Sequence, residues 1–177
     1  MTLPPLWPVF DGHNDLLLNL WLQHDDDPAA AFYSRVTPGH LDFSRMRRGG
    51  FFGGLFAVFI PPVSYIAQMR NQTQDEAQAT FDPLAIAERQ IAILQQLEQA
   101  SQGRLRICRT ATEIEQCRLN RQIAAVLHIE GAGMIDAELT QLEAFYRLGV
   151  RSIGPFWNLP NAFGTGVSGP FPGSPDT

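Results

Sequence analysis

Two apolar segments, residues 51–60 and 123–129, limit the fold of this chain more than any other feature. Neither contains a carboxylate, a lysine or an arginine, and neither alternates between apolar and polar residues. Both are too short to cross a membrane, which takes about 20 residues. They are therefore predicted to be strands buried on both faces, the kind found in parallel sheets that are covered by helices.

Helical segments lie between these strands. The clearest covers residues 83–100, where Asp82 is a good N-cap, Pro83 occupies the first helical position and apolar residues recur every three or four positions. Residues 63–80 show no such periodicity and are predicted to be a long loop with one helical turn. The other predicted helices cover residues 16–22, 42–48 and 110–119, and a last one follows Asp136 as its N-cap.

The alternation of strands and helices predicts an α/β fold with a parallel sheet. Three shorter strands bring the number of βα units to about five: a buried strand that begins at Trp7 and carries the polar residues 11–15 at its C-terminal end, and strands at residues 104–109 and 150–156. An eight-stranded (β/α)8 barrel of the TIM type needs about 250 residues. The 177 residues are therefore predicted to form one domain, 1–177, that is the N-terminal portion of such a barrel, without its C-terminal half.

Composition excludes several classes of function. The chain is 45% hydrophobic with a net charge of −5, which rules out a disordered protein. Its 13 basic residues are all arginine and are scattered, so no nucleic-acid-binding surface is expected. No membrane span or signal-peptide pattern occurs, and a cytoplasmic location is expected. Cys108 and Cys117 cannot form a disulfide framework and are predicted to be packing residues.

Polar residues gather where the first strand ends. Asp11, His13 and Asp15 are spaced by two, so their side chains share one face of the strand. An imidazole and a carboxylate on one face at a strand end can hold a divalent cation, and nitrogen with oxygen suits zinc. The alternative is a buried polar pair in which His13 hydrogen-bonds Asp11.

A second cluster closes the strand at residues 123–129. His128 and Glu130 share a face, and Glu130 at the strand end can bridge two cations through its two oxygens. A carboxylate on the inward face of an apolar strand costs several kcal/mol unless it is paired or bound to metal. The alternative is a solvated Glu130 just past the strand. His128 lies one pleat deeper and is interpreted as a core histidine or a support for the ligands.

Together these residues resemble the membrane (renal) dipeptidase family of zinc peptidases, in a bacterial-type form. Five stretches carry the resemblance in the same order and spacing along the whole chain. They are residues 11–15 (DGHND), 41–50 (LDFSRMRRGG), 125–131 (AVLHIEG), 145–151 (FYRLGVR) and 155–177, which begins PFWNLPNAFG.

The resemblance implies a metal-dependent hydrolase of the βα-barrel kind with two zinc ions per complete site. His13 and Asp15 would bind one zinc, and Glu130 would bridge both. The other two histidine ligands, the catalytic aspartate and a substrate-binding arginine belong to the second half of the barrel, outside this chain. The isolated chain is therefore expected to be inactive, and no catalytic acid or base is assigned within it.

The chain departs from the family where animal members carry a substrate-contacting histidine after the fifth strand. That place reads Phe156-Trp157-Asn158, so Trp157 and Asn158 are expected to contact substrate instead.

The function implied is hydrolysis of the peptide bond of dipeptides through a metal-activated hydroxide. Two alternatives stay open: another metal-dependent amidohydrolase, or a truncated, non-catalytic half-barrel that only self-associates or binds a partner. Assembly into a homo-oligomer is compatible with either.

Overall fold

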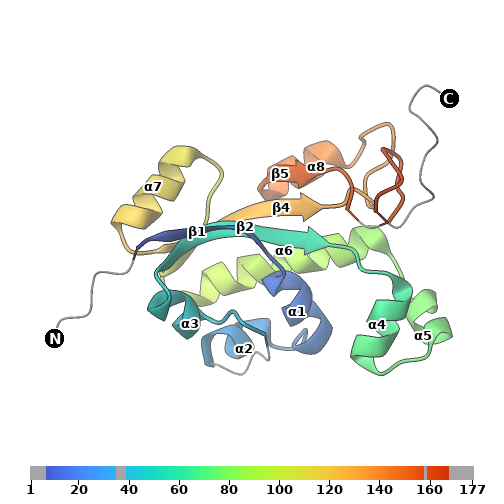
Figure 1. Cartoon of the computed structure of the whole chain (residues 1–177), viewed down its shortest axis with the longest axis horizontal. Helices are drawn as coiled ribbons and strands as arrows, with labels where there is room; N and C mark the ends of the chain where they lie inside the picture. The colour runs from blue at the N-terminus through green and yellow to red at the C-terminus, as the bar shows by residue number, and fades with distance from the viewer. Residues whose placement is uncertain (1–6, 35–38, 158, 168–177) are drawn as a thin grey trace.

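The computed structural model describes residues 7–34, 39–157 and 159–167. Its strands form one parallel sheet (Figure 1). They are β1 (Val9–Asn14), β2 (Phe51–Phe59), β3 (Leu105–Ile107), β4 (Ile123–Glu130) and β5 (Val150–Gly154). The predicted α/β fold is thus confirmed, although the last strand ends at Gly154 and not at residue 156.

The strand order is that of a barrel segment with one addition. β1 pairs with β2, and β2 pairs with β4 along the length of β4. The other edge of β4 is shared: β3 pairs with its first residues and β5 with its last ones. The sequence β1-β2-β4-β5 is therefore the run of neighbours expected in the N-terminal part of a (β/α)8 barrel, and β3 does not lie between β2 and β4.

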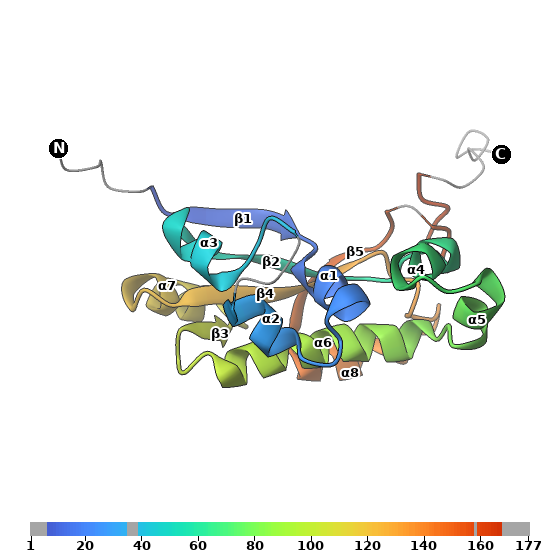
Figure 2. The same ribbon diagram turned by 90° about the horizontal axis from the view of Figure 1, so that it is seen from below.

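Eight helices occur in the described part of the chain. They are α1 (Leu16–Gln23), α2 (Pro28–Ser34), α3 (Phe43–Arg48), α4 (Val63–Arg70), α5 (Gln74–Ala79), α6 (Pro83–Ala100), α7 (Ala111–Leu119) and α8 (Leu142–Leu148). Figure 1 and, in the view from below, Figure 2 show α1, α2 and α6 on one face of the sheet, with α7 on the opposite face.

Successive side chains of β4 point to opposite faces of the sheet, and each face belongs to a different apolar cluster. Ala125, Leu127 and Ile129 belong to the large core that the sheet shares with α1, α2 and α6. Ala124 and Val126 point the other way and pack against Cys108 and Cys117. The second face is thus filled by α7 near the start of β4, which leaves its far end for polar side chains.

Helix α6 forms as its sequence predicts. One carboxylate oxygen of Asp82 accepts hydrogen bonds from the N–H groups of Leu84 and Ala85, and Pro83 stands in the first turn. Ala87, Ile91, Leu94 and Leu97 of its apolar stripe are buried, whereas Leu84 in the first turn is 37% exposed.

The prediction of a loop over residues 63–80 was wrong, because two short helices, α4 and α5, occupy it. Thr73 and Glu76 form a capping box at the start of α5, and Asn71 ends α4 in the left-handed conformation. Their buried core residues are Ile66 and Ala67 in α4 and Ala77 in α5, too few to make an apolar stripe, which is why periodicity missed both helices.

The helix expected after Asp136 begins only at Leu142. The carboxylate of Asp136 instead accepts hydrogen bonds from the N–H and hydroxyl of Thr140, four residues on, and so closes a turn ahead of the helix. Among the described residues, no helix is both long and apolar enough to cross a membrane.

The two cysteines are buried as predicted, with sulfur atoms 3.5 Å apart and no disulfide between them. Burial, reinforced by the neighbouring Cys117, raises the pKa of the Cys108 thiol. A raised pKa keeps the thiol protonated in the folded state, and the thiolate is the reactive form.

We therefore expect neither thiol to react with a disulfide reagent at pH 8 until the chain unfolds. The measurement is the rate of reaction with 5,5′-dithiobis(2-nitrobenzoate) across a urea series, followed alongside circular dichroism. Rapid reaction of the folded protein would contradict the packing described here.

The sheet also presents open edges. Within the described residues, β1 and β5 each pair with one neighbour only, and apolar side chains such as Val9, Phe10 and Ile153 are exposed along them. An open cavity of about 560 Å³ lies against β5 and α8, lined by Phe145, Tyr146 and Ile153 among others. Unpaired edges and exposed apolar grooves favour association.

The 177-residue chain alone is therefore expected to self-associate or aggregate. Sedimentation velocity over a concentration series should show a rising mean sedimentation coefficient. A monodisperse monomer that unfolds cooperatively would count against an incomplete barrel.

Candidate metal centre

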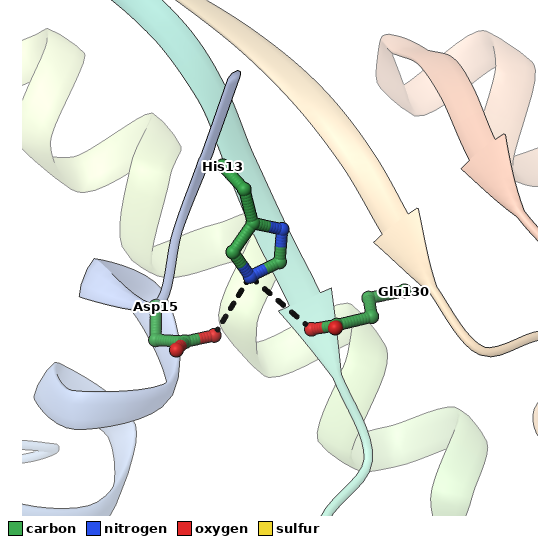
Figure 3. A group of neighbouring side chains, drawn as sticks. All are labelled: His13, Asp15 and Glu130. Carbon is green, nitrogen blue, oxygen red and sulfur yellow. Dashed lines mark hydrogen bonds and ion pairs between the residues drawn. The ribbon is translucent and has the colours of Figure 1, made fainter. Parts of the chain in front are cut away.

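Three ionisable side chains meet at the carboxyl ends of two strands (Figure 3). His13 lies near the end of β1, and Asp15 follows the strand immediately. Glu130 is the last residue of β4. Parallel strands end at the same edge of the sheet, so residues more than a hundred positions apart in sequence come together there.

The distances fit a cation. Nε2 of His13 lies 3.3 Å from Oδ1 of Asp15 and 3.4 Å from Oε2 of Glu130. All three ligand atoms lie within 4.8 Å of one another. Ligand atoms at ~2.1 Å from a tetrahedral zinc ion are about 3.4 Å apart, so the two distances from Nε2 of His13 match those between ligand atoms of one zinc ion. A single N–H on Nε2 cannot point well at both oxygens, whereas a cation can bind all three.

The side chain of Asp15 is directed toward this cluster and does not cap the helix that follows it. It occupies the N-cap position of α1, where an aspartate normally accepts a hydrogen bond from the first turn. Here its side chain makes no capping bond and turns toward His13 instead.

Glu130 is the most buried of the three, its side chain 19% exposed. Burial raises the pKa of its carboxyl group; His13 opposes that rise, and the negative charge of Asp15 adds to it. A cation beside Glu130 would counter both the desolvation and the repulsion from Asp15. Gly131 follows with φ of 77°, a left-handed conformation that turns the chain away directly after the carboxylate.

Asp11, placed on the same strand face by spacing alone, lies outside the three-residue cluster. Its carboxylate accepts hydrogen bonds from the N–H of His13 and from the side-chain amide of Asn14. Asn14, which sequence reasoning did not single out, is buried and also donates to the carbonyl of Leu55 in β2. These bonds fix the end of β1 from which His13 projects.

His128 also lies outside the cluster but next to it. Its Nδ1 lies 2.9 Å from the hydroxyl of Ser152, and its ring stands edge-on to that of His13 at 6.0 Å between centroids. Partial burial, with a smaller contribution from His13, lowers the pKa of His128, which favours a neutral ring.

An open cavity of about 680 Å³ lies over the cluster. Trp157 lines it, as do Phe59 and three residues of α4: Ser64, Tyr65 and Gln68. The α4 wall was missed because residues 63–80 were predicted to be a loop. Asn158, the other expected substrate contact, lies outside the described residues.

A parallel βα sheet with histidine and carboxylate side chains converging at its carboxyl edge is the arrangement of metal-dependent hydrolases built on βα barrels. Comparison with known proteins makes the class specific. The family model described as membrane dipeptidase (peptidase family M19) matches residues 3–173. The chain belongs to that family, and the resemblance seen in the sequence is confirmed.

Solved structures of the family are similar along nearly the whole chain. A metallopeptidase from Rhodobacter sphaeroides, liganded with a phosphinate mimic of the dipeptide L-Ala-D-Ala, is 37% identical with a TM-score of 0.79, over 98% of this chain and 52% of that one. Dipeptidase AC, a metallopeptidase of family M19, is 38% identical with a TM-score of 0.77, over 96% of this chain and 50% of that one.

Among curated proteins, an uncharacterized protein from the PQQ-III 3′ region of Acinetobacter calcoaceticus is 43% identical over 96% of this chain and 55% of its own length. Dipeptidase verJ of Clonostachys rogersoniana is 28% identical over 94% of this chain and 42% of its own length. The chain thus spans about half the length of the relatives it matches. The family and these metallopeptidase relatives imply a metal cofactor.

Proposed function

We propose that this chain is the N-terminal part of a zinc-dependent dipeptidase, and that His13, Asp15 and Glu130 are its zinc ligands. The observation that carries the proposal is the convergence of one imidazole nitrogen and two carboxylates within 4.8 Å at the carboxyl edge of the sheet. Membership of the dipeptidase family supports the reaction.

In the complete barrel, Glu130 would bridge to a second zinc ion, whose other ligands come from the second half. Residues 1–177 then form a partial barrel domain, in keeping with a chain that spans about half of its relatives. If the zinc ligands are divided between two halves of the barrel, the isolated chain would be inactive. Its open sheet edges would pair with further strands or with a second copy of the chain.

Zinc bound here would supply a Lewis acid and lower the pKa of a water molecule toward neutrality. The chain's own residues prepare that chemistry. Asp15 and Glu130 fix the position of the His13 imidazole, while Trp157 and Phe59 give the cavity an apolar side that can hold a dipeptide side chain. Ser64, Tyr65 and Gln68 add neutral hydrogen-bonding groups on the α4 wall.

The test is a panel of dipeptides, acylated amino acids and simple amides, assayed with the protein that contains the remaining barrel half. Hydrolysis of free dipeptides over the other amides supports a dipeptidase. Preference for a non-peptide amide or ester would assign the protein to another class of amidohydrolase.

Glu130 and His128 should differ in their effect on bound metal. Glu130→Gln removes a ligand charge and should lower the zinc content, whereas His128→Gln should preserve the zinc content at saturating metal. The measurement is zinc per chain by elemental analysis after equilibrium dialysis against saturating zinc. Equal loss from both variants would show that His128 is itself a ligand.

His13→Ala removes the one nitrogen donor of the set. It should eliminate the zinc held by this chain, about one of two ions in the complete enzyme, and nearly all dipeptide hydrolysis. The loss should exceed the roughly 10²- to 10⁴-fold effect of removing a general base, because both the Lewis acid and the activated water depend on the metal.

The fold should survive this change, because His13 is 39% exposed and lies at a strand end outside the apolar core. Circular dichroism provides the control. A variant that keeps both zinc ions and near-normal turnover would overturn the assignment of His13.

A further inference from the structure

The imidazole of His13 has neighbours on two sides: the two carboxylates beside Nε2 and the ring of His128. Its Nε2 faces Asp15 and Glu130. The ring of His128 stands beside it at 6.0 Å between centroids and 84° between ring planes, an edge-to-face arrangement. Such contacts prefer one relative orientation of the two rings.

This contact crosses an intervening strand. β1 and β4 both border β2, so their backbones are about 9 to 10 Å apart, twice the spacing of neighbouring strands. Ala57 of β2 pairs in register with His128 and is completely buried. Its single methyl group leaves room above the sheet for the two rings to meet, which a larger side chain at this position would fill.

His128 is in turn held from the other side. Its register partner on β5 is Ser152, and the hydroxyl of Ser152 lies 2.9 Å from Nδ1 of His128. Ser152, His128 and His13 therefore form a row across the face of the sheet that carries the metal cluster. The row ends at Nε2 of His13, the proposed ligand atom.

From this row we infer that His128, anchored by Ser152, is a positioning residue that holds the imidazole of His13 in the orientation needed to bind metal. The inference rests on the proposed function, since it takes His13 as a ligand. Groups that orient a metal-ligating histidine commonly change metal affinity about 10- to 100-fold when they are removed. His128 acts here through ring contact and not as a ligand, so the number of metal ions bound is unchanged and the affinity falls.

The test is the zinc affinity of the protein that contains the remaining barrel half, measured by competition with a chromophoric chelator, because the 177-residue chain alone is expected to self-associate. His128→Ala should weaken zinc binding about 10-fold while the stoichiometry at saturation stays that of wild type. His128→Phe keeps a ring beside His13 and Ser152→Ala keeps the histidine, so each should cause a smaller loss. Cobalt(II) in place of zinc should show a shifted visible absorption band in His128→Ala, because ligand geometry changes.

Val126→Ala is the matched control, since Val126 lies on the same face of β4 two residues deeper and packs against Cys117 and its neighbours. It should leave the zinc affinity and cobalt spectrum as in wild type, which separates positioning from general loosening of the strand. Unchanged affinity and spectrum in His128→Ala would overturn the inference alone. A wild-type chain that binds no zinc would overturn the proposed metal site and the inference with it.

Discussion

The close parallel packing of β1, β2 and β4 is the constraint on which the site depends. Gly53 and Gly54 make it possible: a Cβ at Gly53 would lie 2.8 Å from the carbonyl oxygen of Ala124, and one at Gly54 would lie 2.9 Å from that of Asp11. The two glycines thus let β2 lie against both neighbours at once. With that register set, the ends of β1 and β4 reach the same level, and His13 meets Glu130 across β2.

The carboxylates of Asp15 and Glu130 lie close together, which is electrostatically unfavourable without a cation between them. Two carboxylates within 4.8 Å repel by about 3 kcal/mol at an effective dielectric constant of ~20, less where solvent screens the half-exposed Asp15. His13 opposes, but does not cancel, the rise in the pKa of Glu130 that burial and the charge of Asp15 cause. A divalent cation at the centre would relieve all of these at once, as the proposed metal site requires.

Much of the fold could be predicted from the sequence, because its main signals are local. The uncharged runs of β2 and β4 and the Asp82-Pro83 start of α6 each specify their element without help from the rest of the chain. The same holds for pairing His13 and Asp15 at a strand end. Three other features depend on tertiary contacts and could not be predicted from local patterns. They are the place of β3 beside the start of β4, the hydrogen bond that the Asp11 carboxylate accepts from Asn14, and the position of α4 along the cavity.

The composition of that cavity indicates how substrate recognition would be divided on the proposed function. A free dipeptide carries an ammonium group and a carboxylate. The cavity's ionisable lining residues that the structure describes are His13, Asp15 and Glu130, and none of its described lining residues is an arginine. With Asp15 and Glu130 bound to zinc, the neutral hydrogen-bonding groups of α4 are left for the amino end and the side chains. The carboxylate of the substrate would need a cationic partner from outside this wall, so the remaining barrel half would supply both the second set of metal ligands and the anchor for the carboxyl end.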